Sequence, residues 1–327
     1  MAKKKVLVTG ATGLLGRQVV RAFDEAGWEV IGTGFSRANP PRILKLDITD
    51  QGDVEKVLDD VKPAIIIHCA AEKSPDRCAS DPDGTKALNV AASQLLAEQT
   101  AARNIVLVYI STDYVFDGTP GGAPYETDAE TSPPNFYGET KRDGEIAVIN
   151  ASDRAVVLRV PLLYDHSLPL SFLLVERSIL CEGEVNIVGL VRFGSGDNSE
   201  SAVNILIDTV WNKSGKEKVD MDHWAIRYPT NTEDVARVLK DIAEKYTSED
   251  PTNLPRILQF SSEDRCTKYE ICERLAQVLG LPMPHIIANS TVDPNPSVKR
   301  PYDCHLSTKA LKDLGINVTT MDFEAWW

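Results

Sequence analysis

Two side chains four residues apart could carry out proton transfer. Tyr137 and Lys141 lie in the stretch NFYGETK at 135–141, within a helical pattern at 136–150. Residues at that spacing share one face of a helix, so the ammonium would lie near the phenol. A phenol has a pKa of about 10 in isolation, and a neighbouring positive charge stabilises its phenolate. The pair predicts a tyrosine of lowered pKa that donates a proton near neutral pH, with a plain surface pair as the alternative.

A hydroxyl is expected close to this pair. The apolar run at 105–111 is typical of a buried strand, and Thr112 and Asp113 follow it. Ligands of an open α/β sheet bind at the carboxyl ends of its strands. Thr112 could therefore hydrogen-bond the same carbonyl oxygen that Tyr137 protonates. Asp113 would lie near the site, with either an orienting or a catalytic role.

A glycine-rich loop is expected to bind a diphosphate. The stretch GATGLLG at 10–16 follows the apolar run KVLVT at 5–9. Gly10 would allow a tight turn, Gly13 a close approach of the diphosphate to the backbone, and Gly16 close packing of helix and strand. The helix N-terminus would offer free N–H groups and a positive dipole end. The loop predicts dinucleotide binding, and plain turn glycines are the alternative.

The residues after the second strand indicate which dinucleotide binds. An NAD site requires an acidic residue about 20 positions after the glycine loop. The sequence there reads Gly34-Phe35-Ser36-Arg37, and no acidic residue occurs between Glu29 and Asp47. A guanidinium and a hydroxyl both suit a phosphate. Ser36 and Arg37 therefore predict a site for the 2′-phosphate of NADP(H), whereas a solvated arginine is the alternative.

Strand and helix patterns alternate along the first half of the chain. Short apolar runs occur at 5–9, 29–33, 64–69, 105–111 and 155–160, and helical patterns at 14–26, 51–61, 84–103 and 136–150. Continuous apolar strands are buried on both faces, and their alternation with helices is typical of a parallel sheet. The fold class expected is α/β, a Rossmann-type doubly wound sheet with a smaller, discontinuous C-terminal lobe.

The expected division of the chain falls near residue 162. Residues 1–162 would form the NADP(H)-binding domain, rejoined by an amphipathic helix at 233–246. Residues 163–327 would form the lobe for a substrate or partner. A loop-rich insertion is expected at 182–201, where polar residues separate short apolar runs.

The composition excludes several classes of protein. The 327 residues carry a net charge of −13, which argues against a nucleic-acid partner. No apolar stretch is long enough for a signal peptide or a membrane span. The six cysteines form no Cys-x-x-Cys pair, so we expect reduced thiols, no metal site and a cytoplasmic location.

These motifs together resemble known families. The glycine loop, Ser111 to Asp113, and the Tyr137 and Lys141 pair resemble the extended short-chain dehydrogenase/reductases. Within them, YISTDYVFDG and YGETKRDGE resemble the dTDP-4-dehydrorhamnose reductase branch. Three further segments, HCAAEKSPD, MDHWAIRYPT and TKYEICERLA, are similar to the regulatory β subunits of methionine adenosyltransferase. This resemblance implies the reductase fold, NADP(H) binding and regulation of the enzyme that makes S-adenosylmethionine.

The resemblance also implies a set of cofactor contacts at the ends of the strands. They are Thr12, Gly13, Leu14 and Leu15 at the diphosphate; Phe35, Ser36 and Arg37 at the 2′-phosphate; Asp47 and Ile48 at the adenine; Cys69 and Lys73 near the ribose and diphosphate; Tyr137 and Lys141 at the nicotinamide ribose; and Leu163 at the nicotinamide. For Cys69 and Leu163, simple core packing is the alternative.

Two functions of different class follow. One is a non-catalytic subunit that binds NADP(H) and docks on a methionine adenosyltransferase catalytic subunit. The other is an NADPH-dependent reductase of a nucleotide-linked 4-keto-6-deoxyhexose. In the reductase, Tyr137 would protonate the oxygen while Lys141 lowers its pKa and Thr112 holds the carbonyl. Whether the protein is an enzyme stays open at this point.

Two features near the C-terminus bear on these alternatives. Arg300, followed by Pro301, resembles an Arg-Pro pair that faces the sugar nucleotide in the reductases, and a loop turn is its alternative. The β subunits carry a C-terminal extension that engages the catalytic subunit, whereas this sequence stops at Trp327. The last residues, Ala325 to Trp327, are expected to be the start of a helix.

Overall fold

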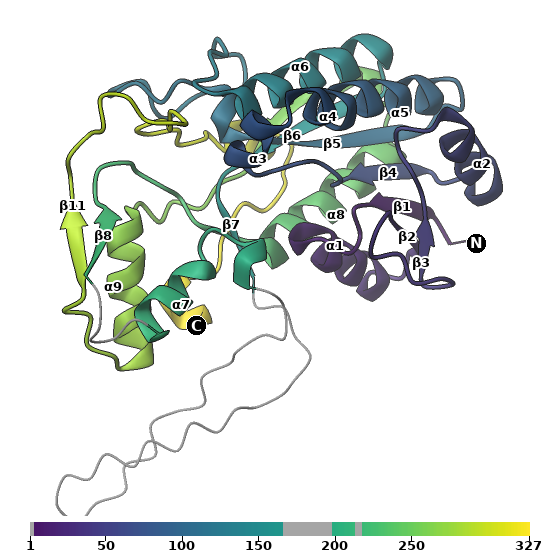
Figure 1. Cartoon of the computed structure of the whole chain (residues 1–327). Coiled ribbons are helices and arrows are strands. Elements are labelled where there is room, and N and C mark those ends of the chain that lie inside the picture. Colours follow the sequence, from purple (N-terminus) through teal and green to yellow (C-terminus); the bar gives the residue numbers. More distant parts are fainter. Residues whose placement is uncertain (1–2, 166–197, 213–217) are drawn as a thin grey trace, which may run out of the picture.

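A computed structural model of the chain describes residues 3–165, 198–212 and 218–327. Within them, a sheet of seven parallel strands has the order β10-β6-β5-β4-β1-β2-β3 (Figure 1). The strands are β1 Lys5–Thr9, β2 Glu29–Gly34, β3 Ile43–Lys45, β4 Ile65–His68, β5 Val106–Thr112, β6 Ala155–Val160 and β10 Ile257–Gln259. The order reverses between β1 and β4, which is where doubly wound sheets bind ligands.

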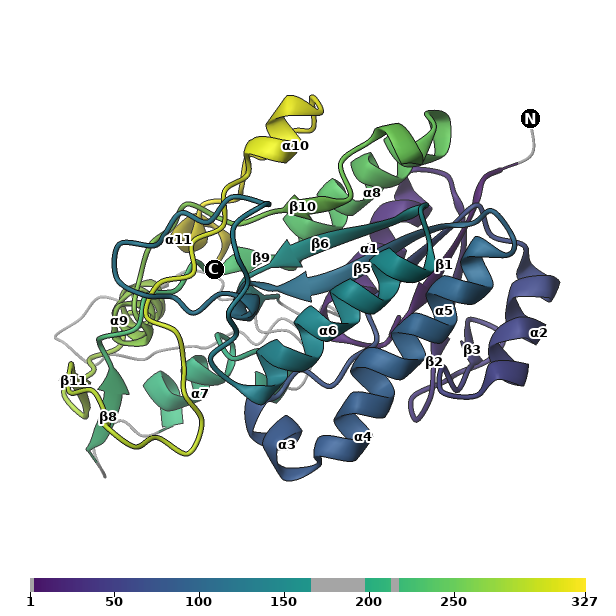
Figure 2. The ribbon, with the colours of Figure 1, turned by 90° about the horizontal axis from the view of Figure 1, so that it is seen from above.

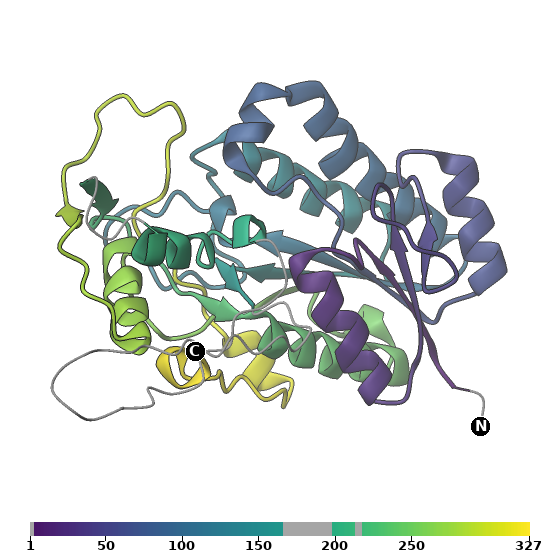
Figure 3. The ribbon, with the colours of Figure 1, turned by 60° about the horizontal axis from the view of Figure 1, so that its bottom comes forward.

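Helices cover both faces of this sheet, as the two views in Figures 1 and 2 show. One face carries α2 Gln51–Val61, α5 Ala92–Ala101 and α6 Phe136–Ala151. The other carries α1 Leu14–Glu25 and α8 Thr232–Ser248, which lie side by side (Figure 3). Leu15, Val19 and Phe23 are buried at four-residue intervals along α1, so one stripe of this helix faces the core.

The connection between β4 and α5 is broken into short segments. α3 Pro75–Ser80 and α4 Pro82–Lys86 are followed by a π-helical turn, Ala87–Ala91. Asp81 separates α3 from α4 and caps α4 by accepting a hydrogen bond from the Gly84 N–H. The stretch expected to be a single helix at 84–103 therefore consists of three consecutive segments, namely α4, the π-helical turn and α5. A π turn contains one residue more than an α-helical turn, and it interrupts the α-helix at 87–91.

A second, smaller lobe lies at the carboxyl ends of the sheet strands (Figures 1 and 2). It contains two short parallel pairs, β7 Leu163–Tyr164 with β9 Thr230–Asn231 and β8 Val219–Asp222 with β11 Ile286–Asn289. Its helices are α7 Ile205–Asn212, α9 Lys268–Leu279 and α11 Phe323–Trp326. The short turns η2 Asp113–Val115, η3 Asn198–Glu200 and η4 Pro251–Asn253 and the helix α10 Lys309–Asp313 complete the described elements.

Side chains at the helix ends explain where the longer helices begin. Asp50, Asn135 and Asn231 cap α2, α6 and α8 by accepting backbone N–H groups of the first turn. Thr267 and Glu270 form a reciprocal capping box at the start of α9. These caps satisfy backbone N–H groups that the first helical turns leave without an acceptor.

The expected fold class is confirmed by this arrangement. The helix expected at 233–246 is α8, and it packs on α1 rather than within the second lobe. β10 also leaves the second lobe and joins the sheet beside β6. Of the loop-rich stretch expected at 182–201, the part up to 197 lies outside the described residues.

Candidate functional site

The glycine loop between β1 and α1 has the geometry that close backbone approach requires. Gly10 has a φ of +64°, and a Cβ there would lie 2.9 Å from the Ala70 backbone nitrogen. A Cβ on Gly16 would lie 2.2 Å from the Gly10 carbonyl oxygen. Gly13 is the N-cap of α1, and it supplies no side-chain cap to the first turn at Leu14 and Leu15. The backbone N–H groups at this end are therefore free to bind an anion.

The residues after β2 are open to solvent and carry positive charge. Phe35 is 61% exposed, and the Lys45 ammonium lies 5.6 Å from its ring centroid. Ser36 and Arg37 are also exposed, and Arg37 forms an ion pair with Glu200. An exposed aromatic ring followed by a hydroxyl and a guanidinium can hold a planar base and a phosphate.

Asp47 and Ile48 follow β3 at the same edge of the sheet. The Asp47 carboxylate accepts hydrogen bonds from the Thr49 hydroxyl at 2.6 Å and the Thr49 N–H at 2.9 Å. These two bonds lower the pKa of Asp47. Ile48 is buried against the core. Asp47 thus offers a fixed polar group, and Ile48 an apolar one, directly after β3.

Cys69 and Lys73 follow β4. Cys69 packs against the core of the sheet, and burial raises the pKa of its thiol to about 12. Such a thiol is protonated at neutral pH and contributes shape rather than charge. The Lys73 ammonium donates a hydrogen bond to the backbone carbonyl of Glu200.

Thr112 and Tyr137 are brought together at the end of β5. The Thr112 hydroxyl donates to the Asp113 carboxylate at 2.9 Å, and the same hydroxyl lies near enough to the Tyr137 phenol to lower the pKa of that phenol. The start of α6 packs tightly on η2, the turn that follows β5, since a Cβ on Gly138 would lie 2.2 Å from the Tyr114 carbonyl oxygen. The hydroxyl and the phenol can therefore face one carbonyl oxygen.

Burial, rather than a neighbouring charge, sets the pKa of Tyr137. Burial raises this pKa, and the neighbouring Thr112 hydroxyl offsets only part of the shift. Lys141 is itself buried, with its ammonium 4.0 Å from the Tyr109 ring centroid, and burial lowers its pKa to about 7. The predicted lowering of the Tyr137 pKa by Lys141 is wrong, because burial raises this pKa and the nearby Asp113 carboxylate raises it further.

Asp113 is the acidic group of the site. Burial raises its pKa to about 6, while the hydrogen bond from Thr112 and the positive charge of Arg227 act in the opposite direction. Arg227 is buried, and its guanidinium donates to the backbone carbonyl of Ile226 at 2.7 Å. Asp113 can therefore exchange a proton close to neutral pH.

Arg300 and Leu163 reach the site from the second lobe. The Arg300 guanidinium lies 3.3 Å from a carboxylate oxygen of Asp76 on α3, so it spans from the lobe to the segment after β4. Leu163 lies in β7, and its carbonyl accepts a hydrogen bond from the Ser201 hydroxyl at 2.8 Å. Arg300 therefore lies at the rim of the site, where the second lobe meets α3, and Leu163 lies beside η3.

Asn89 belongs to the site but was missed by sequence reasoning. It is fully buried in the π-helical turn, where its amide accepts from the Glu72 N–H at 2.9 Å and donates to the Glu72 carbonyl at 3.0 Å. The same amide donates to the Thr140 hydroxyl at 3.2 Å. Asn89 thus ties the loop after β4 to α6, and no feature of the sequence marks the π turn that places it.

Arg17 and Glu200 were also missed. Arg17 directly follows the glycine loop, and its guanidinium donates to a Glu200 carboxylate oxygen at 2.7 Å. The position of Arg17 after the last loop glycine is a signal that sequence reasoning could have used. Glu200 is separated from Arg17 by the whole Rossmann half, so its approach is visible only in the structure.

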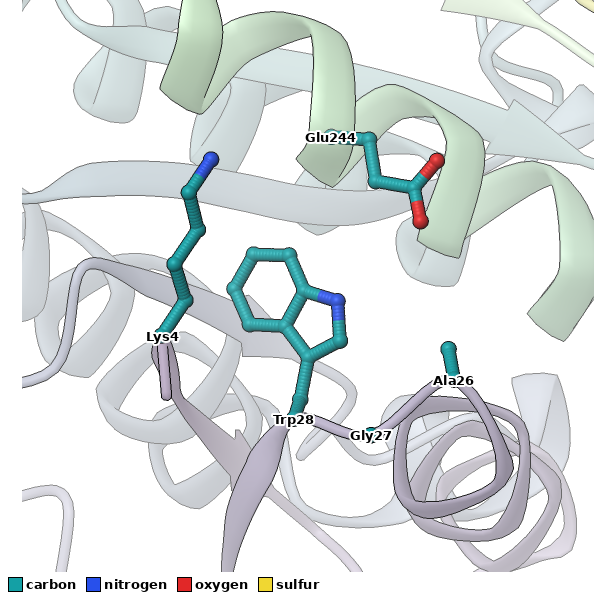
Figure 4. A pocket seen from close by; sticks show the side chains of 5 residues that line it. All are labelled: Lys4, Ala26, Gly27, Trp28 and Glu244. Atoms are coloured by element: carbon teal, nitrogen blue, oxygen red, sulfur yellow. The ribbon is translucent and has the colours of Figure 1, made fainter. Parts of the chain in front are cut away.

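One shallow pocket lies away from these residues. It is lined by Lys4, Ala26, Gly27, Trp28 and Glu244 (Figure 4). Apart from Glu244 of α8, the lining residues lie at the amino ends of β1 and β2, whereas ligands of doubly wound sheets bind at the carboxyl ends. This pocket is therefore not part of the candidate site.

Three further observations concern the described residues alone. The cysteines among them, Cys69, Cys78, Cys266, Cys272 and Cys304, are free thiols. The described residues contain no group of histidine, cysteine and carboxylate side chains arranged to hold a metal ion. No helix among them has the length and apolar character needed to cross a bilayer.

The sequence and the structure are similar to known proteins over nearly their whole length. A family model described as the RmlD substrate binding domain matches residues 4–189 and 171–323. The β subunit of methionine adenosyltransferase 2 from Xenopus tropicalis is 38% identical over 317 residues, covering 97% of this chain and 84% of that relative. A probable dTDP-4,6-dihydroxy-2-methyloxan-3-one 4-ketoreductase from Streptomyces antibioticus is 40% identical over 159 residues, covering 48% of this chain and 51% of its own.

The solved structures agree on the fold. The dTDP-4-dehydrorhamnose reductase of Bacillus anthracis, determined in complex with NADP, superposes with a TM-score of 0.76. That match covers 99% of this chain and 96% of the other at 21% sequence identity. The chain therefore belongs to the RmlD substrate binding domain family, in the group that includes the β subunits of methionine adenosyltransferase 2.

Proposed function

We propose that this protein is an NADP(H)-binding regulatory subunit of a methionine adenosyltransferase and acts in S-adenosylmethionine biosynthesis. The observation that carries the proposal is the similarity to the β subunits, which extends over 97% of this chain. The Streptomyces ketoreductase, by contrast, matches only 48% of it. The catalytic subunit would be the partner, in the cytoplasm.

The choice of NADP(H) rests on two positively charged side chains, Arg17 in α1 and Arg37 after β2. Arg17 and Arg37 converge on one carboxylate beside the glycine loop, so the site is built for an anion. The loop also fits a dinucleotide, because its glycines allow the tight turn at Gly10 and the close packing of α1 on that turn at Gly16 that are typical of diphosphate-binding loops. Phe35, Ser36, Asp47 and Ile48 would surround the adenosine half, and Lys73 and Leu163 would lie toward the diphosphate and nicotinamide, as proposed from the sequence.

A reductase of a nucleotide-linked 4-keto-6-deoxyhexose is the second candidate, favoured by the contact between Thr112 and Tyr137. NADPH would supply the hydride in such a reaction. Tyr137 would donate its proton to the carbonyl oxygen, and the Thr112 hydroxyl would hydrogen-bond that oxygen. A charged Lys141 would stabilise the resulting phenolate, and Arg300 would contact the substrate at the rim.

Two assays distinguish these functions. The first mixes the protein with the methionine adenosyltransferase catalytic subunit of the same organism and measures complex formation by size-exclusion chromatography with light scattering. The second follows NADPH absorbance with dTDP- and UDP-4-keto-6-deoxyglucose, using Tyr137→Phe as the control. A stable complex with no turnover supports the regulatory subunit. Turnover that is lost in the variant, without complex formation, contradicts it.

A further inference from the structure

Three basic side chains from three different elements converge on Glu200. The Arg17 guanidinium, in α1, donates to one carboxylate oxygen at 2.7 Å, and the Arg37 guanidinium, after β2, pairs with the other oxygen. The Lys73 ammonium, after β4, donates to the Glu200 backbone carbonyl. Glu200 itself lies in η3, on the chain that leads into α7 of the second lobe, and η3 lies beside the start of α1 (Figures 1 and 3).

The carboxylate is held as an anion by this arrangement. Partial burial raises the pKa of Glu200, but the hydrogen bonds from Arg17 and Arg37 outweigh it and the net shift is downward. Arg17 also donates to the Thr12 carbonyl at 3.0 Å, which fixes its guanidinium beside the glycine loop. Two guanidiniums on one carboxylate form a site that a phosphate also satisfies, because both anions accept several charge-assisted hydrogen bonds.

We propose that Glu200 occupies the 2′-phosphate subsite of the free protein, and that NADP(H) displaces it to bind Arg17 and Arg37. The inference rests on the proposed NADP(H) binding and adds two residues to it. Arg17 becomes a specificity residue alongside Arg37. Glu200 becomes an internal competitor that lowers the affinity for any ligand bearing a phosphate at this position.

Displacement of Glu200 has a structural consequence in the second lobe. The next residue, Ser201, donates through its hydroxyl to the Leu163 carbonyl and accepts from the Val203 N–H at 3.1 Å. Glu200 is therefore the point at which the start of α7 is tied to the glycine loop. Binding of the 2′-phosphate breaks the ion pairs of Glu200 with Arg17 and Arg37. Cofactor binding is transmitted to the second lobe through the loss of these two ion pairs.

The test compares two probes that differ only in the relevant phosphate. Isothermal titration calorimetry measures binding of 2′,5′-ADP (adenosine 2′,5′-bisphosphate) and of 5′-AMP to the full chain, to Glu200→Gln and to Glu233→Gln. Glu233 is a matched control, because it pairs with Arg21 at 3.5 Å one helical turn from Arg17. We expect Glu200→Gln to bind 2′,5′-ADP about 3- to 10-fold more tightly, the range that one or two partly exposed ion pairs support, and to bind 5′-AMP with unchanged affinity.

Two further variants test the competition between Glu200 and the 2′-phosphate. Arg17→Ala should weaken 2′,5′-ADP binding and leave 5′-AMP binding unchanged. The affinity of Glu200→Asp for 2′,5′-ADP should lie between those of wild type and Glu200→Gln, because the aspartate side chain is shorter. If Glu200→Gln binds 2′,5′-ADP no more tightly than wild type does, Glu200 is not a competitor and the inference fails. If wild type and every variant bind the two probes equally, there is no 2′-phosphate site, and the proposed NADP(H) binding fails as well.

Discussion

At the scale of single residues, desolvation governs the titration of the candidate site. Burial lowers the pKa of Lys141 to about 7 and raises that of Asp113 to about 6, so both groups exchange protons close to neutral pH. Tyr137 shifts upward for the same reason. The charge state of the site therefore depends on what enters it, because a bound ligand changes the solvation of all three groups.

Replacement of Arg37 tests the cofactor assignment. Arg37→Ala should weaken NADPH binding by about 10- to 100-fold, the effect of losing a charge-assisted hydrogen bond to a phosphate. NADH lacks that phosphate, so its affinity should change little. A fluorescence titration with both cofactors measures the two effects, and Arg42→Ala, an exposed arginine in the same loop, is the control. Equal losses for NADPH and NADH would exclude the 2′-phosphate assignment.

His68 gives the protein a pH-dependent stability. Its ring is buried between the Thr9 hydroxyl at 2.7 Å and the Ser93 hydroxyl at 3.1 Å, and burial lowers its pKa to about 3. An unfolded histidine titrates near pH ~6.5. Below that pH the unfolded chain gains a proton that the folded chain excludes, so stability falls by up to ~1.4 kcal/mol per pH unit as the pH drops toward 3.

The measurement is urea unfolding at several pH values. His68→Asn should remove this contribution, so the free energy of unfolding of wild type should fall more steeply than that of the variant between neutral pH and about pH 5. If the free energies of unfolding of the two proteins fell in parallel as the pH dropped, His68 would be protonated in the folded state, contrary to this prediction.

At the scale of elements, a buried ion pair fixes the helix that carries Tyr137 and Lys141. Glu145 in α6 binds the Arg159 guanidinium of β6 through both carboxylate oxygens, at 2.9 and 2.7 Å. Both side chains are almost completely buried, and the guanidinium lies over the Phe116 ring. This pair ties α6 to β6 of the sheet.

Neutralisation of one partner should be costly. Glu145→Gln leaves a buried guanidinium without its counter-charge, and we expect the free energy of unfolding to fall by about 3–5 kcal/mol. Asp60→Asn, in the exposed pair of Asp60 with Lys56, should leave it unchanged within error. Urea denaturation of both variants provides the comparison, and a loss shared equally by the two would contradict the special role of α6.

The elements differ in how well the sequence predicts them. The strands at 5–9, 105–111 and 155–160 are nearly continuous apolar runs, and their bounds agree with β1, β5 and β6 to within one residue. The π turn at 87–91 has no such signature, because its backbone shift depends on Asn89 bonding to Glu72, which lies outside the helix. Local periodicity predicts elements well where burial is continuous and poorly where a distant contact sets the backbone.

The candidate site shows the same limit. The glycine loop and the pair of Tyr137 with Lys141 could be predicted because their spacing within one segment implies their geometry. The sequence could not give the direction of the Tyr137 pKa shift, since it does not show burial. Nor could it place Glu200, which reaches Arg17 across 183 positions of sequence separation. The assignment of individual cofactor contacts and of the domain boundary near residue 162 stays a prediction.

At the scale of the whole molecule, the two halves of the sequence share one core. Val235, Leu239 and Ile242 of α8 are buried with Val19 and Phe23 of α1. The face of the sheet that α1 covers is therefore completed by residues from the second half of the chain. The stability of the glycine loop depends on a helix more than two hundred residues away.

Truncation within this shared core should destabilise the entire protein. Leu239→Ala removes a fully buried side chain and should cost about 2–5 kcal/mol. Because the core is shared, we expect circular dichroism and tryptophan fluorescence to report one coincident transition. Ile287→Ala, at an exposed position of β11, is the control and should have little effect. Two separate transitions in Leu239→Ala would mean that the halves unfold independently.

The return of α8 and β10 to the sheet also bears on how the chain is made. When the ribosome has released only the first 160 residues, β6 has an unpaired edge where β10 will later bind. The apolar face of α1 likewise lacks α8 at that stage. An open strand edge beside uncovered apolar surface invites pairing with other chains. The nascent protein is therefore expected to need shielding, as by a chaperone, until synthesis has passed β10.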